Sequence, residues 1–315
     1  MVIIVRILVR EQIYAKQVQK ELIFYGFSQM FSIRKKNQLS LSSRFSFMTY
    51  SDQKVVVVCD FSERMNEVIV HGARLADILK KELCLFALWK DKSQKTEVQE
   101  KLILMSRNLK SKLPDLQISN LILRNTLPDN IEKLVNDYNS VLVVLHQEQI
   151  KNSMKAFRES SIPFLFVSGS SAEYLQYKNV LVPVDYRKAS KETSLWASYF
   201  GRFNHSLIQV IYARESDRDN ENQLMRNVKF FQKFLSSLNV RLSLTEGKSS
   251  SWGICKETLE NAQKLKGDVM IFSGSSTITL IDLMIGLPEK RIVQKAGNLP
   301  VMLINPRKDI CMICD

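Results

Sequence analysis

The segments KVVVVCDFSE (residues 54–63) and NVLVPVDYRK (residues 179–188) decide the fold of this chain of 315 residues. Each is a run of apolar, mostly β-branched residues that ends in an aspartate, Asp60 or Asp185, and these aspartates are 185 − 60 = 125 residues apart. An unbroken apolar run of this kind is typical of a strand that is buried on both faces. Because a short polar stretch and a helical pattern follow both runs, we predict two copies of one domain.

The two copies also end alike. SIPFLFVSG around Pro163 and NLPVMLINP around Pro300 are short apolar strands that a proline introduces, 300 − 163 = 137 residues apart. These limits predict a leader at 1–47, a first domain at 48–170, a second domain at 171–307 and a tail at 308–315. Each domain then has a usual size for an α/β fold, and the repeat is too long for a solenoid.

Strands and helices are predicted to alternate in both domains. The first domain has strands at 54–60, 83–90, 117–124, 140–146 and 162–168 and helices at 67–81, 98–113 and 129–138. The second has strands at 180–185, 206–214, 240–247, 268–274 and 299–305 and helices at 191–203, 220–238 and 254–265. Right-handed crossovers then give an α/β fold with two tandem, open, parallel five-stranded sheets and helices on both faces.

The first helix of the second domain, at 191–203, has apolar residues spaced for one helical face. They are Leu195, Trp196, Tyr199, Phe200 and Phe203. The long helix at 220–238 is amphipathic in the same way, and we expect four of its residues to point inward: Leu224, Val228, Phe231 and Leu235.

The net charge of the chain is +13, and the leader carries much of it. Residues 1–47 hold eight Lys or Arg and two Glu, a net of +6, so the repeated body carries 13 − 6 = +7. Spread over two domains without an aromatic and basic stripe, this charge indicates a solvated surface rather than a nucleic-acid partner.

The leader lacks the alternation of the two domains. Its apolar run MVIIVRILV is interrupted by Arg6 and is too short to span a bilayer. The later part, SIRKKNQLSLSSRFSF, is Ser-rich, basic and free of acids, as in an organelle transit peptide. We favour Met48 as the true start of the protein, with a targeting segment or a genuine appendage as the alternatives. For the body we expect a cytoplasmic location and no membrane partner.

The five cysteines are odd in number and form no disulfide framework, which fits a reducing cytosol. Cys59 and Cys84 fall within strands and are predicted to be inert core residues. Cys255 lies in a predicted helix. Cys311 and Cys314 form a CxxC at the C-terminal end, which we interpret as part of a frayed tail rather than as a redox or metal site.

Residues that could carry catalysis are scattered. His71, His146 and His205 have no Cys, Asp or Glu at the spacing of a convincing metal site, and we place His71 and His205 at the surface. Asp60 and Asp185 have no evident acid, base or nucleophile as a partner, and no catalytic triad, Walker-type loop or GxGxxG is present. These observations argue against an enzyme, although weak nucleotide hydrolysis stays open.

Three stretches of the second domain resemble the universal stress protein family, and the resemblance extends over residues 54–305 as a tandem member. They are NVLVPVDYRKASKETSLWAS, GDVMIFSGSS and IGLPEKRIVQKAGNLPVMLI. The resemblance implies a fold like that of the adenine nucleotide alpha hydrolases. It also implies that, in nucleotide-binding members, the loop after the fourth strand holds the phosphates. This loop carries a glycine pair, nine residues, and then Gly followed by Ser or Thr, while the first-strand aspartate meets adenosine.

The phosphate motif is degenerate in this chain. Its glycine pair falls on Ser273 and Ser276, and its last element falls on Gly286 and Leu287, so only one of three expected glycines is in place. Gly274 lies one position late, and Leu287 removes a hydroxyl that would contact phosphate. The candidate cleft consists of Asp185, Ser273, Gly274, Ser275, Ser276, Gly286 and Leu287, with ATP as its ligand if it binds one. The first domain has Glu148 near the phosphate position, and we expect no nucleotide there.

The resemblance implies a regulatory or stress-response protein that acts by protein interaction or signalling. The alternative is an ATP-binding switch that works through the second domain, and a third reading, a membrane-associated or organelle protein, depends on the leader. The last strands of the two domains, at 162–168 and 299–305, are apolar edges, so we predict that they pair and form an intrachain pseudo-dimer. A homodimer of such chains and an unknown protein partner stay open.

Overall fold

The computed structural model describes residues 53–169, 174–274 and 287–305, which all belong to the unit Met48–Asp315. The predictions for the leader, for Ser275, Ser276 and Gly286, and for Cys311 and Cys314 lie outside the described residues.

Strands and helices alternate in the first half of this unit, as predicted. Its elements are β1 (Lys54–Val58), α2 (Met65–Leu79), β2 (Glu82–Trp89), α3 (Gln94–Lys112), β3 (Ile118–Arg124), α4 (Leu127–Asn136), β4 (Ser140–His146), the 3₁₀ turn η3 (Gln147–Gln149), α5 (Ile150–Glu159) and β5 (Phe164–Val167).

The second half repeats the alternation after the short turn η4 (Tyr174–Gln176). Its elements are β6 (Asn179–Val184), η5 (Lys188–Glu192), α6 (Thr193–Asn204), β7 (Leu207–Tyr212), α7 (Arg218–Ser237), β8 (Leu242–Glu246), α8 (Ile254–Glu260), β9 (Val269–Ser273), α10 (Pro288–Lys295) and β10 (Val301–Ile304).

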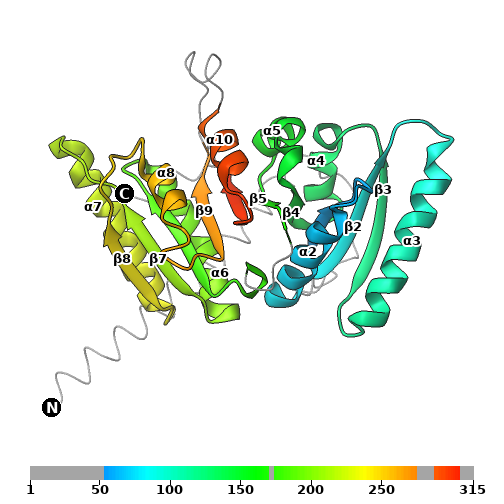
Figure 1. Cartoon of the computed structure of the whole chain (residues 1–315), viewed down its shortest axis with the longest axis horizontal. Helices are drawn as coiled ribbons and strands as arrows, with labels where there is room; N and C mark the ends of the chain where they lie inside the picture. Colours follow the sequence, from blue (N-terminus) through cyan, green and yellow to red (C-terminus); the bar gives the residue numbers. More distant parts are fainter. Residues whose placement is uncertain (1–52, 170–173, 275–286, 306–315) are drawn as a thin grey trace, which may run out of the picture. The chain divides into compact units, whose positions relative to one another are not determined.

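The strands form a ten-stranded sheet in the order β3-β2-β1-β4-β5-β10-β9-β6-β7-β8 (Figure 1). Pairing within each half is parallel, and the two halves meet where β5 and β10 pair antiparallel, with Val301 opposite Phe166 and Leu303 opposite Phe164. The predicted parallel α/β fold and the predicted pairing of the two edge strands are thus confirmed. Each half keeps five strands, and the two sheets are continuous through this seam.

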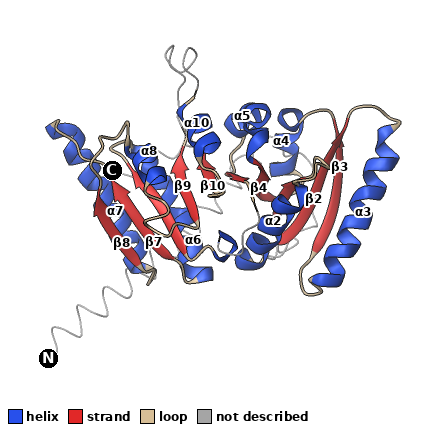
Figure 2. Ribbon diagram, viewed as in Figure 1, coloured by secondary structure: helices blue, strands red, loops and turns tan. Residues whose placement is uncertain are grey.

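Helices cover both faces of the sheet (Figure 2). Right-handed crossovers place α2 and α3 on one face and α4 and α5 on the other, and they separate α6 and α7 from α8 and α10 in the same way. Helix α2 contacts α6, and α5 contacts α10, so corresponding helices of the two halves share a face. Between these layers lies the core, in which the central residues of β1, β4, β6 and β9 have no exposed surface.

Helix α6 differs from the expectation for an amphipathic helix. Of the apolar residues spaced for one face, only Phe200 is buried, whereas Leu195 is 47% exposed and Phe203 is 48% exposed. Small residues of the same helix, such as Ser194, Ala197 and Gly201, face the sheet instead. They let the helix backbone approach closely, so Leu195 and Phe203 lie outside, while Trp196 and Tyr199 are only partly buried against the core.

Two further elements differ from the prediction. Helix α5, a ten-residue helix between β4 and β5, is not predicted from the sequence. Helix α8 ends at Glu260, five residues before the predicted end, where Asn261 bonds to the Glu257 carbonyl through both its backbone and its side-chain nitrogen (3.0 and 2.9 Å).

Candidate functional site

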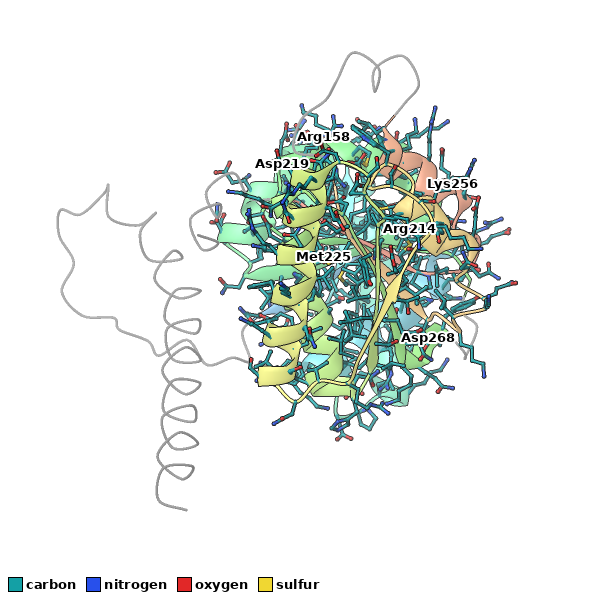
Figure 3. The ribbon with its side chains drawn as sticks, turned by 90° about the vertical axis from the view of Figure 1, so that its left-hand side faces the viewer. Arg158, Arg214, Asp219, Met225, Lys256 and Asp268 are labelled. Atoms are coloured by element: carbon teal, nitrogen blue, oxygen red, sulfur yellow. The ribbon has the colours of Figure 1, made fainter. Side chains whose placement is uncertain are left out.

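The candidate cleft lies at the carboxyl end of the parallel strands of the second half, where open α/β sheets bind ligands. In Figure 3 this end is toward the top, near Arg214 after β7 and Lys256 on α8, whereas Asp268 before β9 lies toward the bottom. Asp185 follows β6 and Ser273 ends β9, while Leu287 directly precedes α10. The structure therefore brings the ends of β6 and β9 to one edge.

Asp185 is 3% exposed, and both of its carboxylate oxygens are bound by its own chain. Oδ1 accepts hydrogen bonds from the backbone N–H of Arg187 (2.9 Å) and from Ser190 Oγ (2.6 Å). Oδ2 accepts from Nε (2.7 Å) and Nη2 of the Arg187 guanidinium, which gives a two-pronged ion pair. The carboxylate is therefore saturated without a ligand.

Neighbouring side chains fix this pair in place. Asn227 of α7 has no exposed surface, and its amide nitrogen donates to the carbonyls of Asp185 (2.8 Å) and Arg187 (2.9 Å). Burial disfavours the charged form of Arg187, but the hydrogen bond and the charge of Asp185 outweigh it and raise the pKa of the guanidinium. The turn after β6 is thus a closed hydrogen-bonded unit that the sequence analysis did not foresee.

Two further ionisable groups lie close to the pair. Burial, and then the negative charge of Asp185, raise the pKa of the Cys255 thiol to about 12, so Cys255 is not a thiolate nucleophile at neutral pH. Glu289, in the first turn of α10, is 3% exposed, and its charge contributes to the raised pKa values of both Cys255 and Arg187. A carboxylate thus occupies the helix N-terminus that would otherwise attract phosphate.

Gly274 has a structural reason to be glycine. Its N–H donates to the Ile304 carbonyl at the end of β10 (2.8 Å), and a Cβ at this position would lie 3.0 Å from the Phe157 ring of α5. Ser273 is buried, and its hydroxyl donates to the Gly274 carbonyl (3.3 Å). Gly274 therefore serves the contact between the two halves, and Leu287 packs partly buried against the core.

In the first half, the corresponding aspartate, Asp60, also accepts hydrogen bonds from its own chain. Asp60 is exposed, and its oxygens accept from the Ser62 N–H (3.0 Å) and from Gln149 Nε2 (2.6 Å). Desolvation opposes ionisation of Asp60, but these hydrogen bonds prevail and lower its pKa. Glu148 forms an exposed ion pair with Arg64 (3.1 Å). That this half binds no nucleotide stays a prediction.

The prediction that His71 lies at the surface is wrong, because the segment between the two halves covers it. His71 has no exposed surface; its Nδ1 lies 2.5 Å from the Tyr177 hydroxyl, and its Nε2 lies 2.9 Å from the Gly169 carbonyl. A carbonyl only accepts, so Nε2 carries the proton and Nδ1 accepts from tyrosine. The partners are 98 and 106 residues away, so no sequence spacing could reveal them.

The other two histidines differ in exposure: His146 is buried and His205 is exposed. His146 at the end of β4 is 2% exposed, and its Nε2 lies 3.5 Å from a Glu67 oxygen, which itself accepts from the Gly169 N–H (2.7 Å). His205 is exposed at the end of α6, as predicted. Within the described residues, no group of three or more His, Cys, Asp and Glu side chains is arranged to hold a metal ion.

A cavity of about 460 Å³ lies elsewhere, between α4 and the chain that leads into β5. Asp129, Glu132 and Glu159 are among its lining residues, and no residue of the candidate cleft is. In the part of the chain that the structure describes, no helix has the length and apolarity needed to cross a bilayer.

The architecture defines a class of proteins: paired open α/β domains whose candidate ligand clefts lie at the carboxyl ends of the strands. Among solved structures, a universal stress protein from Archaeoglobus fulgidus DSM 4304 superposes with a TM-score of 0.60 at 12% identity, over 82% of this chain and 98% of that one. A functionally unknown protein from Pseudomonas aeruginosa PAO1 gives a TM-score of 0.53 at 14% identity, over 82% and 93% of the two chains. The chain therefore has the universal stress protein fold.

Comparisons at the level of sequence gave nothing. No protein-family model matches the chain, and no curated protein matches it.

Proposed function

We propose that this chain is a cytoplasmic regulatory protein of the universal stress type, which acts by protein interaction and not by binding nucleotide. The fold supports the stress-response assignment, because the chain covers nearly the full length of a universal stress protein from Archaeoglobus fulgidus. The engaged carboxylate of Asp185 supports the absence of nucleotide binding. Fold alone does not determine activity, so the site carries the argument.

The pairing of Asp185 with Arg187 is the observation that carries this proposal. In nucleotide-binding relatives, the corresponding aspartate meets the adenosine end of the ligand. Here both oxygens of Asp185 already accept two hydrogen bonds each. A nucleoside would have to displace the guanidinium, at about 1.5–3 kcal/mol for each charge-assisted hydrogen bond that is lost. Such a loss weakens binding by several powers of ten.

Two more features support a cleft closed to phosphate. The buried Glu289 places a carboxylate at the start of α10, where like charge disfavours an anion. Gly274 is committed to the seam, because its N–H bonds to β10 and its Cα faces Phe157. Neither the N-terminal dipole of α10 nor the backbone of Gly274 is then available to bind a phosphate.

The second candidate function is an ATP-binding switch in the second half. One observation favours it: Ser273 and Leu287 stand at the end of β9 and the start of α10, so they bracket the position of the family's phosphate loop. The Arg187 side chain is 44% exposed, so a ligand could reach it from solvent.

Isothermal titration of the full chain with Mg-ATP separates the two functions. We expect no saturable heat up to millimolar nucleotide. The variant Arg187→Ala opens Asp185 and should gain weak binding, whereas Arg214→Ala, which removes an exposed arginine paired with Glu246, should not. An affinity of the unaltered chain tighter than about 50 µM, abolished by Ser273→Arg, would establish the switch and overturn the proposal.

A further inference from the structure

Helix α6 presents an apolar ridge on the outside of the molecule. Leu195 and Phe203 are about half exposed, and Trp196 and Tyr199 are partly exposed on the same side of the helix. The Trp196 and Tyr199 rings meet edge to face at 5.4 Å, and the Tyr199 and Phe203 rings stack at 6.0 Å. These four residues form a continuous row, which we call the α6 ridge.

Small residues of α6 fill most of the side that faces the sheet, and Trp196 and Tyr199 pack partly against the core. Leu195 and Phe203 are therefore the most exposed residues of the α6 ridge. Soluble proteins usually bury side chains of this size, and a contiguous apolar patch on a surface marks an interaction site. Trp and Tyr are also the residues that favour an apolar environment with a polar edge. The composition of the α6 ridge therefore indicates a surface that meets a partner.

The surroundings of the α6 ridge are mostly basic, with one acid, Glu192, at the N-cap of α6. Helix α6 contains Arg202 and no acidic residue, and Arg202 lies over the Phe203 ring at 5.2 Å. Lys191, just before α6, lies over the Phe230 ring of α7 at 5.4 Å. After Glu221, α7 carries three exposed cations and no acid in its helical range; they are Arg226, Lys229 and Lys233.

The charge of the helices on this face comes mainly from α3, in the other half of the sheet, because α2, α6 and α7 together carry only 6 − 4 = +2. Helices α2, α3, α6 and α7 carry 11 Lys or Arg and 6 Asp or Glu, a net of 11 − 6 = +5. The helices of the opposite face, α4, α5, α8 and α10, carry 8 − 6 = +2. Val70 on α2 (39% exposed) and Leu104 on α3 (61% exposed) are two further exposed apolar residues on the face that carries α6.

We propose that the α6 ridge docks on an anionic membrane surface, with its rings at the level of the lipid headgroups and the nearby cations against the lipid charges. Aromatic and aliphatic residues beside Lys and Arg are the composition of helices that lie in a membrane interface. A cytoplasmic leaflet supplies the negative charge. This membrane contact departs from the expectation of no membrane partner for the body.

The charges and the shape favour a bilayer over other occupants. In a symmetric contact with a second copy, the basic surroundings of one α6 ridge would face those of the other, which like charges disfavour. A partner helix usually enters a groove, whereas α6 offers a ridge. A bilayer interface can deform around a ridge, and its charge is opposite to that of this face.

The test is co-sedimentation of the full chain with vesicles, at an ionic strength of about 0.1 M. We expect binding to phosphatidylcholine vesicles that contain about 30% phosphatidylserine, and little binding to pure phosphatidylcholine. The variant Trp196→Ser/Phe203→Ser should reduce partitioning by about tenfold or more. Trp252→Ser, which removes a tryptophan that is 88% exposed on the loop before α8, is the matched control and should bind like the unaltered chain.

A second measurement reports on the α6 ridge directly. The chain has three tryptophans, so Trp89→Phe/Trp252→Phe leaves Trp196 as the only one. Its emission should shift to shorter wavelength when phosphatidylserine vesicles are added, because the indole enters a less polar medium. An unchanged emission would overturn the proposal.

Three other outcomes also contradict it. Absence of binding to the charged vesicles would do so. Equal binding of Trp196→Ser/Phe203→Ser, with circular dichroism showing an intact fold, would place the membrane contact elsewhere in the chain. A dimer of the unaltered chain in light scattering that becomes a monomer in the same variant would assign the α6 ridge to a second copy.

Discussion

At the residue scale, the ion pair between Asp185 and Arg187 occupies the carboxylate of the aspartate, and it should also stabilise the fold. Arg187→Ala leaves a buried carboxylate with two of its four hydrogen bonds. Because the Arg187 side chain is 44% exposed, we expect a moderate loss of about 1–3 kcal/mol in the free energy of unfolding. Urea titration measures this loss. Arg214→Ala should change stability by less than about 0.5 kcal/mol, and an equal effect of the two variants would contradict the special role of Arg187.

His71 provides a residue-scale prediction about pH. Burial lowers the pKa of His71 from 6.5 to about 4, so the unfolded chain binds more protons between these values. The stability that the neutral ring contributes is complete above pH 6.5 and is lost as pH falls from 6.5 to 4. The expected loss is 6.5 − 4 = 2.5 pKa units, or about 3 kcal/mol.

The comparison with His71→Gln isolates this contribution, because the carboxylates of the protein titrate in both chains. Glu67 is the nearby charge, and it opposes the lowering of the His71 pKa, as does the hydrogen bond to Gly169. Unfolding by urea at several pH values should give a steeper loss of stability for the unaltered chain than for the variant. Parallel curves would show that His71 is not buried in its neutral form.

At the element scale, α6 depends on a close approach to the chain that leads into β8. A Cβ at Gly201 would lie 2.2 Å from Val240 Cγ1. Gly201→Ala should therefore destabilise the protein by about 1–3 kcal/mol, although alanine favours helix more than glycine does. Thermal unfolding measures the loss. In the background of Val240→Ala the same substitution should cost little, and an equal cost in both backgrounds would exclude this contact as the cause.

The elements that the sequence could predict are those with an unambiguous pattern. The run Val55–Val58 is apolar without interruption, and so are the runs in β6 and β9, which leaves little choice other than buried strands. Helix α5 carries a helical signal that the prediction did not use, because Ile150, Met154 and Phe157 recur at i, i+4 and i+7 and are all buried. The outward turn of α6 could not be predicted, because it depends on the small residues that pack below the helix.

The sequence indicates where the candidate cleft lies, but not which side chains bond to Asp185 or pack against Gly274. The end of β6, the end of β9 and the start of α10 lie together, as the repeat and the family resemblance implied. The occupation of Asp185 by Arg187, two residues further on, depends on a side-chain rotamer that no sequence spacing reports. The role of Gly274 depends on Phe157, which comes from the other half of the chain.

At the scale of the whole molecule, the two halves are joined by more than the pairing of β5 and β10. The Asn305 side-chain nitrogen donates to the carbonyls of Phe157 (3.1 Å), Arg158 (3.1 Å) and Ser160 (2.6 Å), which end α5 in the first half. Asn305→Ala leaves these carbonyls without this donor. We expect a loss of about 1–3 kcal/mol in one cooperative unfolding transition.

Asn120→Ala is the matched control for Asn305, since Asn120 makes an exposed hydrogen bond to Ser106 within the first half. It should leave stability nearly unchanged. If Asn305→Ala instead splits the urea transition into two, the halves are independent folding units and the seam is weaker than the structure indicates.

The central claim is that Asp185, the aspartate of the second-half cleft, is held by Arg187 and is not open to a nucleotide. Nuclear magnetic resonance of the Arg187 side chain tests it most directly, because a guanidinium held by a buried carboxylate should give a slowly exchanging Nε–H signal, assigned by its absence in Arg187→Ala. The account predicts that this signal is present in the free protein and does not move when Mg-ATP is added to millimolar concentration. A saturable shift of the signal by Mg-ATP would contradict the account and show that nucleotide competes for Asp185.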